Sequence, residues 1–292
     1  MKNVKRLLAI FSLFYLLNTT VAYSQNSTPY VLVNFKGKKT SWKKLIKQMN
    51  QSDVIFFGEE HNCVMAHWLT KQLLLEWTKT DSLNKSFVLE MFERDQQSSL
   101  DSLIQGKFEL KDLPKHTATW SNYETDYSPF LELALQKKMP IVASNIPRKY
   151  ASLLFKQNRD SLKALPQEER NYICPLDFPV DRELSQYKQL IEMEQHMSGK
   201  NFVEAQAIKD ATMAESVFKE LKKGNKVFHL NGSYHSDFQQ SILWYLEYYK
   251  PGSKTVTISI VRQDGKKLSD EMKGRADFIF VIPVDFPVSY EN

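Results

Sequence analysis

The chain has 292 residues, of which 42% are hydrophobic, 25% charged and 12% aromatic. This composition is typical of a globular protein and excludes a disordered, collagen-like or small disulfide-rich chain. The formal net charge is +5, but Lys2, Lys5 and Arg6 supply three of the positive charges, so that residues 26–292 carry only +2. Such a small excess does not neutralise a row of phosphates, which argues against nucleic acid as a partner.

The first 25 residues have the pattern of a secretory signal peptide. A basic start precedes an apolar run over residues 7–17, and small and polar residues follow over 21–25. That run would span roughly 16 Å as a helix, about half the hydrocarbon core of a bilayer, which favours a cleaved signal over an uncleaved anchor. We expect residues 26–292 to form one exported, soluble domain, periplasmic or secreted, with no cysteine at the cleavage region for lipid attachment.

Apolar runs of strand length recur in chain order over residues 54–57, 87–89, 141–143, 227–230, 256–261 and 278–282. Segments with helical periodicity lie between them, over 64–78, 128–138, 147–156, 182–197, 202–222 and 235–249. Strands that alternate with helices predict an α/β fold of three layers (α/β/α) with a mainly parallel sheet. A helical insertion is expected over about 157–200, and the last two strands are candidates for an antiparallel pair at one edge.

The two cysteines, Cys63 and Cys174, leave two alternatives open. An exported protein permits a disulfide between them, but a chain of this length does not require one, and two unpaired thiols fit equally well. Because the sequence contains neither a CxxC nor a CxxCH motif, it excludes a zinc ribbon, a thioredoxin-type site and covalent c-type haem.

Polar residues follow four of the predicted strands. In parallel sheets, ligands bind at the carboxyl ends of the strands, so we expect these residues to lie at one edge. They are Glu59 and His61 after the first strand, Glu90, Glu93 and Asp95 after the second, Asn145 and Arg148 after the third, and Tyr234 and His235 after the fourth.

Four of these residues, Glu59, His61, Glu90 and His235, suggest two kinds of chemistry. Carboxylates with neutral imidazoles suit a divalent metal such as Zn, Mn or Fe, and they also suit general acid–base catalysis. The alternative is structural, with hydrogen-bonded histidines and an ion pair between Glu90 and Arg148.

A second feature is the aromatic segment over residues 120–130, which contains Trp120, Tyr123 and Tyr127. Aromatic residues that lead into a helix are typical of core packing. They also fit the wall of a flat apolar slot in which a tyrosine ligates ferric iron, since tyrosine is a known haem ligand.

Six ordered blocks of sequence resemble the ChaN-like family of haem-binding uptake proteins in the Tiki superfamily. They are Gly58-Glu59-Glu60-His61-Asn62 with His67, the segment 88–97, Trp120 with Asp126-Tyr127 and Pro129, the segment 143–148, Ala205-Gln206 with residues 210–214, and Gly232-Ser233-Tyr234-His235.

The resemblance implies an α/β three-layer fold and an exported protein that binds haem for iron uptake. It implies a tyrosine ligand, with Tyr127 and Tyr123 as first candidates and Tyr234 as the third, and haem stacked across a homodimer. Outer-membrane uptake machinery is the implied partner. Trp120, His61, Arg148 and His235 are expected near the haem, where a cationic side chain would pair with the propionates or lower the pKa of the ligand tyrosine.

Relatives in the wider superfamily include metal-dependent proteases and erythromycin esterases. They imply an alternative, a hydrolase that acts on an ester or peptide through Glu59, His61, Glu90, Arg148 and His235. A third reading keeps these residues as a structural network in an interaction module. The sequence departs from the family pattern in having Ala66 where a second histidine is frequent, and no lipid-attachment cysteine.

Overall fold

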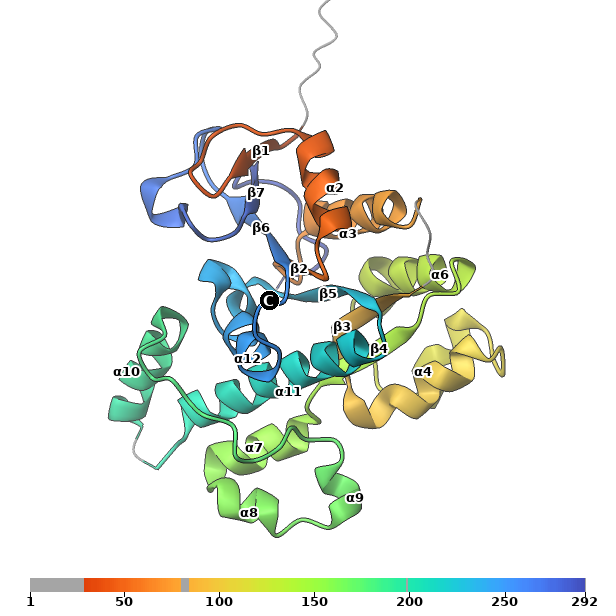
Figure 1. Ribbon diagram of the computed structural model, residues 1–292, viewed down its shortest axis with the longest axis vertical. Helices are drawn as coiled ribbons and strands as arrows, with labels where there is room; N and C mark the ends of the chain where they lie inside the picture. The colour runs from red at the N-terminus through yellow and green to blue at the C-terminus, as the bar shows by residue number, and fades with distance from the viewer. Residues whose placement is uncertain (1–28, 80–83, 198, 292) are drawn as a thin grey trace, which may run out of the picture.

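The computed structural model describes residues 29–79, 84–197 and 199–291 (Figure 1). The predicted signal peptide over residues 1–25 lies outside these ranges. The strands are β1 Val31–Asn34, β2 Val54–Glu59, β3 Lys85–Glu93, β4 Ile141–Asn145, β5 Lys226–Gly232, β6 Thr255–Arg262 and β7 Phe278–Ile282. The helices are α2 Trp42–Gln51, α3 Val64–Trp77, α4 Gln97–Ile104, α5 Leu113–His116, α6 Ser128–Gln136, α7 Arg148–Lys156, α8 Arg159–Lys163, α9 Gln167–Arg170, α10 Lys188–His196, α11 Phe202–Lys222 and α12 Ile242–Tyr249.

The strands form one mainly parallel sheet in the order β1-β7-β6-β2-β5-β3-β4. All six strands that the apolar runs predict are present, and β1 is an additional strand that was not predicted. The expectation of an antiparallel final pair was wrong: β6 and β7 are parallel, and the antiparallel pair is β1 with β7. Residues 263–277 are long enough to return the chain to the start of the neighbouring strand, as a parallel pair requires.

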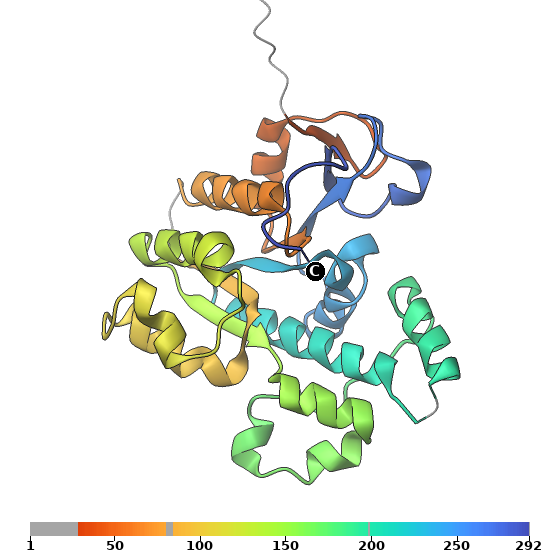
Figure 2. The same ribbon diagram turned by 180° about the vertical axis from the view of Figure 1, so that it is seen from behind.

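Helices cover both faces of the sheet and make it the middle of three layers (Figures 1 and 2). Side chains of β2 alternate between the two cores: Ile55 and Phe57 pack with α2, α3, α4 and α6, whereas Val54 and Phe56 pack with α7, α11 and α12. A strand buried on both faces is apolar along its whole length, which is why β2 is an unbroken hydrophobic run.

The predicted helical insertion over 157–200 contains α8, α9 and α10, which lie beyond α7 and α11 (Figure 1). Two predicted helices begin later than expected, since α10 begins at Lys188 and α12 at Ile242. Before α12 the chain forms short 3-10 turns in which Phe238, Gln239 and Ser241 have positive φ angles of 57°, 58° and 54°. Because this conformation is incompatible with an α-helix, the helix that periodicity predicts from residue 235 cannot begin there.

The two cysteines are buried free thiols and do not form a disulfide with each other. Of the two alternatives that the sequence left open, the structure has the unpaired one. Cys63 packs in the core of α3, and Cys174 packs in the core of α11 on the other face of the sheet. Among the helices of the described residues, none combines the length and apolar character needed to cross a membrane.

Candidate functional site

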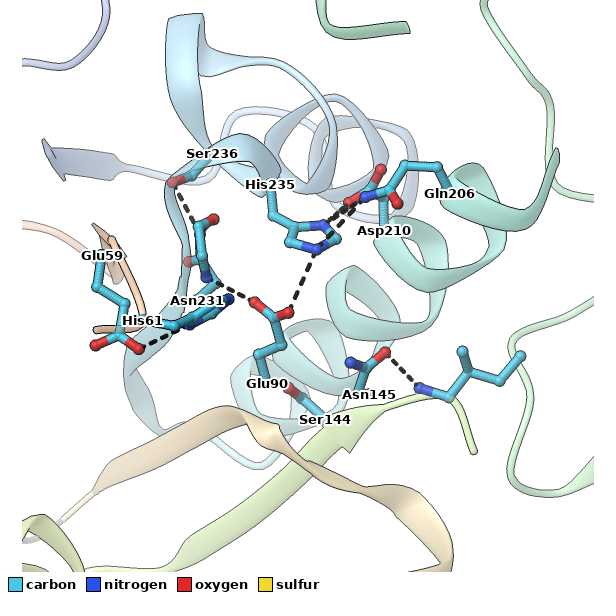
Figure 3. Close-up of polar contacts among 12 residues, drawn as sticks. Glu59, His61, Glu90, Ser144, Asn145, Gln206, Asp210, Asn231, His235 and Ser236 are labelled. Carbon is cyan, nitrogen blue, oxygen red and sulfur yellow. Dashed lines mark hydrogen bonds and ion pairs between the residues drawn. The ribbon is translucent and has the colours of Figure 1, made fainter. Parts of the chain in front are cut away.

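The predicted strand-end residues come together at the carboxyl edge of β2, β5 and β3, which are neighbours in the sheet. Glu59 ends β2, Gly232 ends β5 and Glu90 lies in β3. His235 follows β5 on a 3-10 turn over Ser233–His235. Figure 3 shows Glu90 between the His61 side and the His235 side of this edge.

His235 lies between two buried carboxylates. Its Nε2 is 3.4 Å from Glu90 Oε1, and its Nδ1 is 2.5 Å from Asp210 Oδ1 (Figure 3). Asp210 comes from the buried face of α11 and accepts a second hydrogen bond of 2.8 Å from the Tyr187 hydroxyl. The backbone N–H of Gly232 donates a 2.6 Å hydrogen bond to Glu90 Oε2. The partner of Glu90 is therefore His235, and not Arg148 as the structural alternative expected.

The charges in this cluster depend on one another. Burial alone would lower the pKa of His235, but the carboxylates of Glu90 and Asp210 raise it to about 10. Burial would likewise raise the pKa of Glu90, but the His235 charge and hydrogen bond lower it well below its ordinary range. Burial raises the pKa of Asp210. At neutral pH the cluster thus contains a protonated imidazole, which is a proton donor and not a base.

A second cluster surrounds Glu59. Its Oε1 accepts a 2.7 Å hydrogen bond from the Tyr127 hydroxyl and lies 3.0 Å from His61 Nδ1. Its Oε2 lies 3.5 Å from Nε2 of His67, whose Nδ1 is 3.6 Å from Asp126 Oδ1. The whole cluster is buried except for His61, which is partly exposed.

Gly232 separates the two clusters. A Cβ atom at this position would lie 2.7 Å from His61 Nε2 and 3.6 Å from Glu90 Oε2. The absence of a side chain at Gly232 thus allows His61 and Glu90 to approach each other across the end of β5.

The four residues expected to bind a metal therefore gather at one edge but do not form one ligand set. Glu59 is directed to Tyr127 and His61, and Glu90 is directed to His235 and Gly232. In the part of the chain that the structure describes, no three His, Cys, Asp or Glu side chains are placed to hold a metal ion. The expectation of a divalent metal bound by Glu59, His61, Glu90 and His235 is not supported, because the carboxylates have internal partners.

A hollow of about 440 Å³ opens beside these clusters. Its lining includes Glu90, Trp120, Arg148, Asn145 and Lys209. The Trp120 ring meets the His61 ring edge-on, with centroids 4.8 Å apart, and meets the Tyr127 ring in the same way at 5.6 Å. Trp120 therefore connects the hollow to the Glu59 cluster.

The three candidate tyrosines occupy different positions. Tyr123 and Tyr127 lie on a π-helical turn over Tyr123–Tyr127 and are buried, with Tyr127 only 1% exposed. Burial and the Glu59 charge raise the pKa of Tyr127 well above its ordinary value. Burial raises the pKa of Tyr123 to about 12, and burial with the Asp210 charge raises that of Tyr234 to about 12. The Tyr234 hydroxyl donates to the Gln186 carbonyl.

The carboxyl-terminal segment over residues 286–290 lies against the loop that follows β2. The Ser289 backbone N–H donates to the Asn62 carbonyl at 2.8 Å, and Asn62 Nδ2 donates to the Tyr290 carbonyl at 3.2 Å. Ser289 Oγ also donates to Asp126 Oδ2 at 2.6 Å. This segment therefore lies against the Glu59 cluster at Asn62 and Asp126.

Sequence reasoning did not assign roles to Asp210, His67, Asp126 or Lys209. For Asp210 a signal was present, because Gln206 and Asp210 are polar residues four positions apart on a helix that is otherwise largely buried. The His67 side chain is similarly buried on an apolar helix. Asp126 and Lys209 resemble ordinary surface residues in the sequence, and only the tertiary structure brings them to the site.

The fold and the site define the class of this protein: a three-layer α/β protein with acid–histidine clusters and a hollow at the carboxyl edge of a mainly parallel sheet. The model of one sequence family, described as haem-binding uptake, Tiki superfamily, ChaN, matches residues 45–246. The chain belongs to this family.

Solved structures share the fold. ChaN of Campylobacter jejuni, described with cofacial haem, has a TM-score of 0.65 at 20% identity over 86% of this chain and 96% of that one. A Bacillus cereus protein has a TM-score of 0.51 at 12% identity over 87% and 94%. A mutant of the erythromycin esterase EreC in its open conformation has a TM-score of 0.50 at 9% identity over 88% and 98%. No curated protein sequence matches the chain.

Proposed function

We propose that this protein binds haem in the hollow at the carboxyl edge of β2, β5 and β3. The observation that carries the proposal is the position of Trp120, which lines the hollow and contacts the rings of both His61 and Tyr127 behind it. A flat apolar macrocycle packs well against aromatic side chains, and the family membership supports haem as that ligand. The residues present therefore fit the group.

Tyr127 is the iron ligand that we propose, with Tyr123 and Tyr234 as alternatives. Phenolate oxygen ligates ferric haem iron in other proteins. The Tyr127 proton already lies on a 2.7 Å hydrogen bond to Glu59 Oε1, so Glu59 is the group placed to receive it. Tyr127 is only 1% exposed and its ring packs against Trp120, so ligation of iron by its oxygen would require a local rearrangement.

The proposal extends to the biological role: an exported, periplasmic or secreted carrier of haem for iron uptake. The signal-like sequence over residues 1–25 and the family membership support it. A homodimer that stacks haem between its subunits, and outer-membrane uptake machinery as the acceptor of the haem, belong to the same proposal.

The test is a titration of the purified protein with ferric haem, followed by visible absorbance. We expect saturable binding with a high-spin, tyrosinate-type spectrum. Tyr127→Phe should remove that spectrum, while Tyr123→Phe and Tyr234→Phe should retain it. Unchanged binding by Tyr127→Phe, with loss in one of the other two variants, would transfer the ligand role to that tyrosine. No saturable binding by the unaltered protein would overturn the proposal.

A hydrolase at the same edge is the second candidate. The observation in its favour is the protonated His235, which lies beside Glu90, a residue of the hollow's lining. The His235 imidazolium would deliver a proton to a leaving group. His61, Glu59 and Arg148 would then position the substrate. A screen of esters and peptides tests this candidate, and turnover that Glu90→Gln and His235→Asn both abolish would support it.

A further inference from the structure

The strand β4 is the last strand of the sheet at the end where α4 lies (Figure 1). It pairs with β3 on one side, and no strand of the described residues lies beyond it. The Pro140 carbonyl accepts a 2.9 Å hydrogen bond from the Phe87 N–H, so Pro140 faces β3. Because the backbone groups of successive residues in a strand point to opposite sides, those of Ile141 and Ala143 point away from the sheet. Such an open edge is a surface on which a strand of another chain can pair.

The side chain of Gln97 occupies this open edge. Its Nε2 donates to the Ile141 carbonyl at 3.0 Å, and its Oε1 accepts from the Ala143 N–H at 2.7 Å. In a parallel sheet, one residue of a neighbouring strand makes the same two hydrogen bonds, to the carbonyl of one residue and the N–H two positions on. The carboxamide of Gln97 therefore fills one hydrogen-bonding position of a strand that the described sheet does not contain.

Asp101 fixes the orientation of this carboxamide. Gln97 Nε2 also donates to Asp101 Oδ1 at 2.9 Å, so both amide hydrogens have acceptors. The Ile141 carbonyl and the Asp101 carboxylate only accept hydrogen bonds, and the Ala143 N–H only donates. Only one orientation of the carboxamide satisfies all three partners, and Gln97 is itself held as the first residue of α4.

The opposite end of the sheet is closed by backbone instead. The chain turns back beyond β1, where the Thr40 N–H donates to the Leu32 carbonyl at 3.0 Å and Val33 forms an antiparallel bridge with Lys39. Within the described ranges, no isolated bridge of this kind covers β4. A hollow of about 430 Å³, here called the β4 hollow, opens beside it and is lined in part by Gln97 and residues 140–143. The side chain of Gln97 thus does at β4 what a backbone turn does at β1.

The sequence of β4 favours pairing wherever its edge is free. Charged side chains commonly discourage pairing at an edge strand, and Ile141–Asn145 contains none. Its first residues, Ile141 and Val142, are β-branched and have high strand propensity. Two identical edges can pair antiparallel about a two-fold axis, so that each copy completes the edge of the other. The partner that fits this edge best is therefore a second copy of this chain.

We propose that the Gln97 carboxamide takes the place of a neighbouring strand and keeps the β4 edge closed to a second copy of this chain. Removal of the carboxamide frees the Ile141 carbonyl and the Ala143 N–H, and two copies then pair through β4. This role is separate from the proposed haem site, because Gln97 lines the β4 hollow and not the hollow at the carboxyl edge.

Hydrogen exchange in dilute Gln97→Ala protein tests the first consequence. Alanine retains a high helix propensity at the start of α4. The Ala143 amide should exchange about tenfold faster than in the unaltered protein, because it loses its acceptor. The Val142 amide, which faces β3, should keep its rate. Equal acceleration of the two amides would indicate general loosening of β4 and would overturn the proposal, as would an unchanged rate at Ala143.

Light scattering without haem tests the second consequence. Gln97→Ala should show an association step that grows with protein concentration and that the unaltered protein lacks. A synthetic peptide of residues 139–145 should bind this variant, suppress its association and leave the unaltered protein unbound. Faster exchange at Ala143 with neither added association nor peptide binding would contradict the closed edge.

Two control variants separate the hydrogen-bonding role of Gln97 from a loss of stability. Gln97→Glu keeps an acceptor for the Ala143 N–H and would bring like charges together in a symmetric pair, so it should not associate. Gln105→Ala removes the same group from an exposed position at the end of α4 and should behave as the unaltered protein. Association of either control to the extent of Gln97→Ala would overturn the proposal. Because neither measurement uses haem, the outcome is independent of the proposed function.

Discussion

His67 and His235 share one arrangement, in which a buried imidazole lies between two carboxylates. His67 lies 3.5 Å from Glu59 and 3.6 Å from Asp126, and His235 lies 3.4 Å from Glu90 and 2.5 Å from Asp210. In each arrangement one carboxylate comes from a central strand and the other comes from a helical segment. The two contacts differ in strength, because His235 is hydrogen-bonded to Asp210 whereas neither ring nitrogen of His67 forms a hydrogen bond with the described residues.

His235→Asn should destabilise the protein strongly, because it leaves Glu90 and Asp210 buried without a cationic partner. Breaking a buried ion pair typically costs about 3–5 kcal/mol in the free energy of unfolding. Urea unfolding measures the change. His196→Asn, at an exposed position on α10, is the control and should change the free energy by less than about 0.5 kcal/mol. A His235→Asn protein as stable as the control would contradict the charged triad.

The free energy of unfolding should depend on pH in a window defined by His235. Its folded-state pKa of about 10 exceeds the ordinary value of 6.5, so its contribution is complete below pH 6.5 and is lost as the pH rises towards 10. The lowered pKa of Glu90 acts in the opposite direction, with a contribution present above its ordinary 4.5 and lost on acidification. We expect a maximum between pH 4.5 and 6.5, and a loss of a few kcal/mol towards pH 10, at about 1.4 kcal/mol per pKa unit.

Urea titrations at several pH values between 4 and 10 measure this curve. In His235→Asn the fall above pH 6.5 should largely disappear. A fall of the same size in that variant would assign the pH dependence to other groups.

Gly232→Ala should displace His61, because the added methyl group would lie 2.7 Å from His61 Nε2. Such overpacking typically costs about 1–3 kcal/mol. A double-mutant cycle tests the cause: in a His61→Ala background the clash is gone, so the same glycine substitution should cost little. Equal costs in both backgrounds would show that the effect of Gly232 does not pass through His61.

Removal of residues 287–292 should expose Cys63. Val288 forms a β-bridge with Cys63, a fully buried residue at the edge of the core next to the carboxyl-terminal segment. The truncated protein should react with a thiol reagent at Cys63 at least tenfold faster than the full chain, since the covering segment is lost. Cys174 is the internal control, because it is buried on the other face of the sheet and should react at an unchanged rate. Equal acceleration at both thiols would indicate general unfolding instead.

The parallel sheet was predictable because strands buried on both faces are unbroken apolar runs, as in β2. Because the carboxyl ends of parallel strands meet at one edge of a sheet, the sequence also predicted that Glu59, His61, Glu90 and His235 lie at that edge. What it did not provide was the pairing of carboxylates with imidazoles, which depends on β5 lying between β2 and β3. Asp210 and Asp126 come from helical segments whose polar residues resemble solvent-exposed ones in sequence. The late start of α12 follows from the positive φ angles of Phe238, Gln239 and Ser241, which hydrophobic periodicity does not report.

The position of β5 also bears on how the chain folds. Its register pairs His229 with Phe56 of β2 and Phe228 with Phe87 of β3, so the two halves of the site meet only through a strand far along the chain. Contacts of such long sequence separation require closure of large loops and form slowly. A chain emerging from the ribosome therefore has no binding edge until Lys226–Gly232 has been synthesised. Until then β2 and β3 expose unpaired edges on which a chaperone can act.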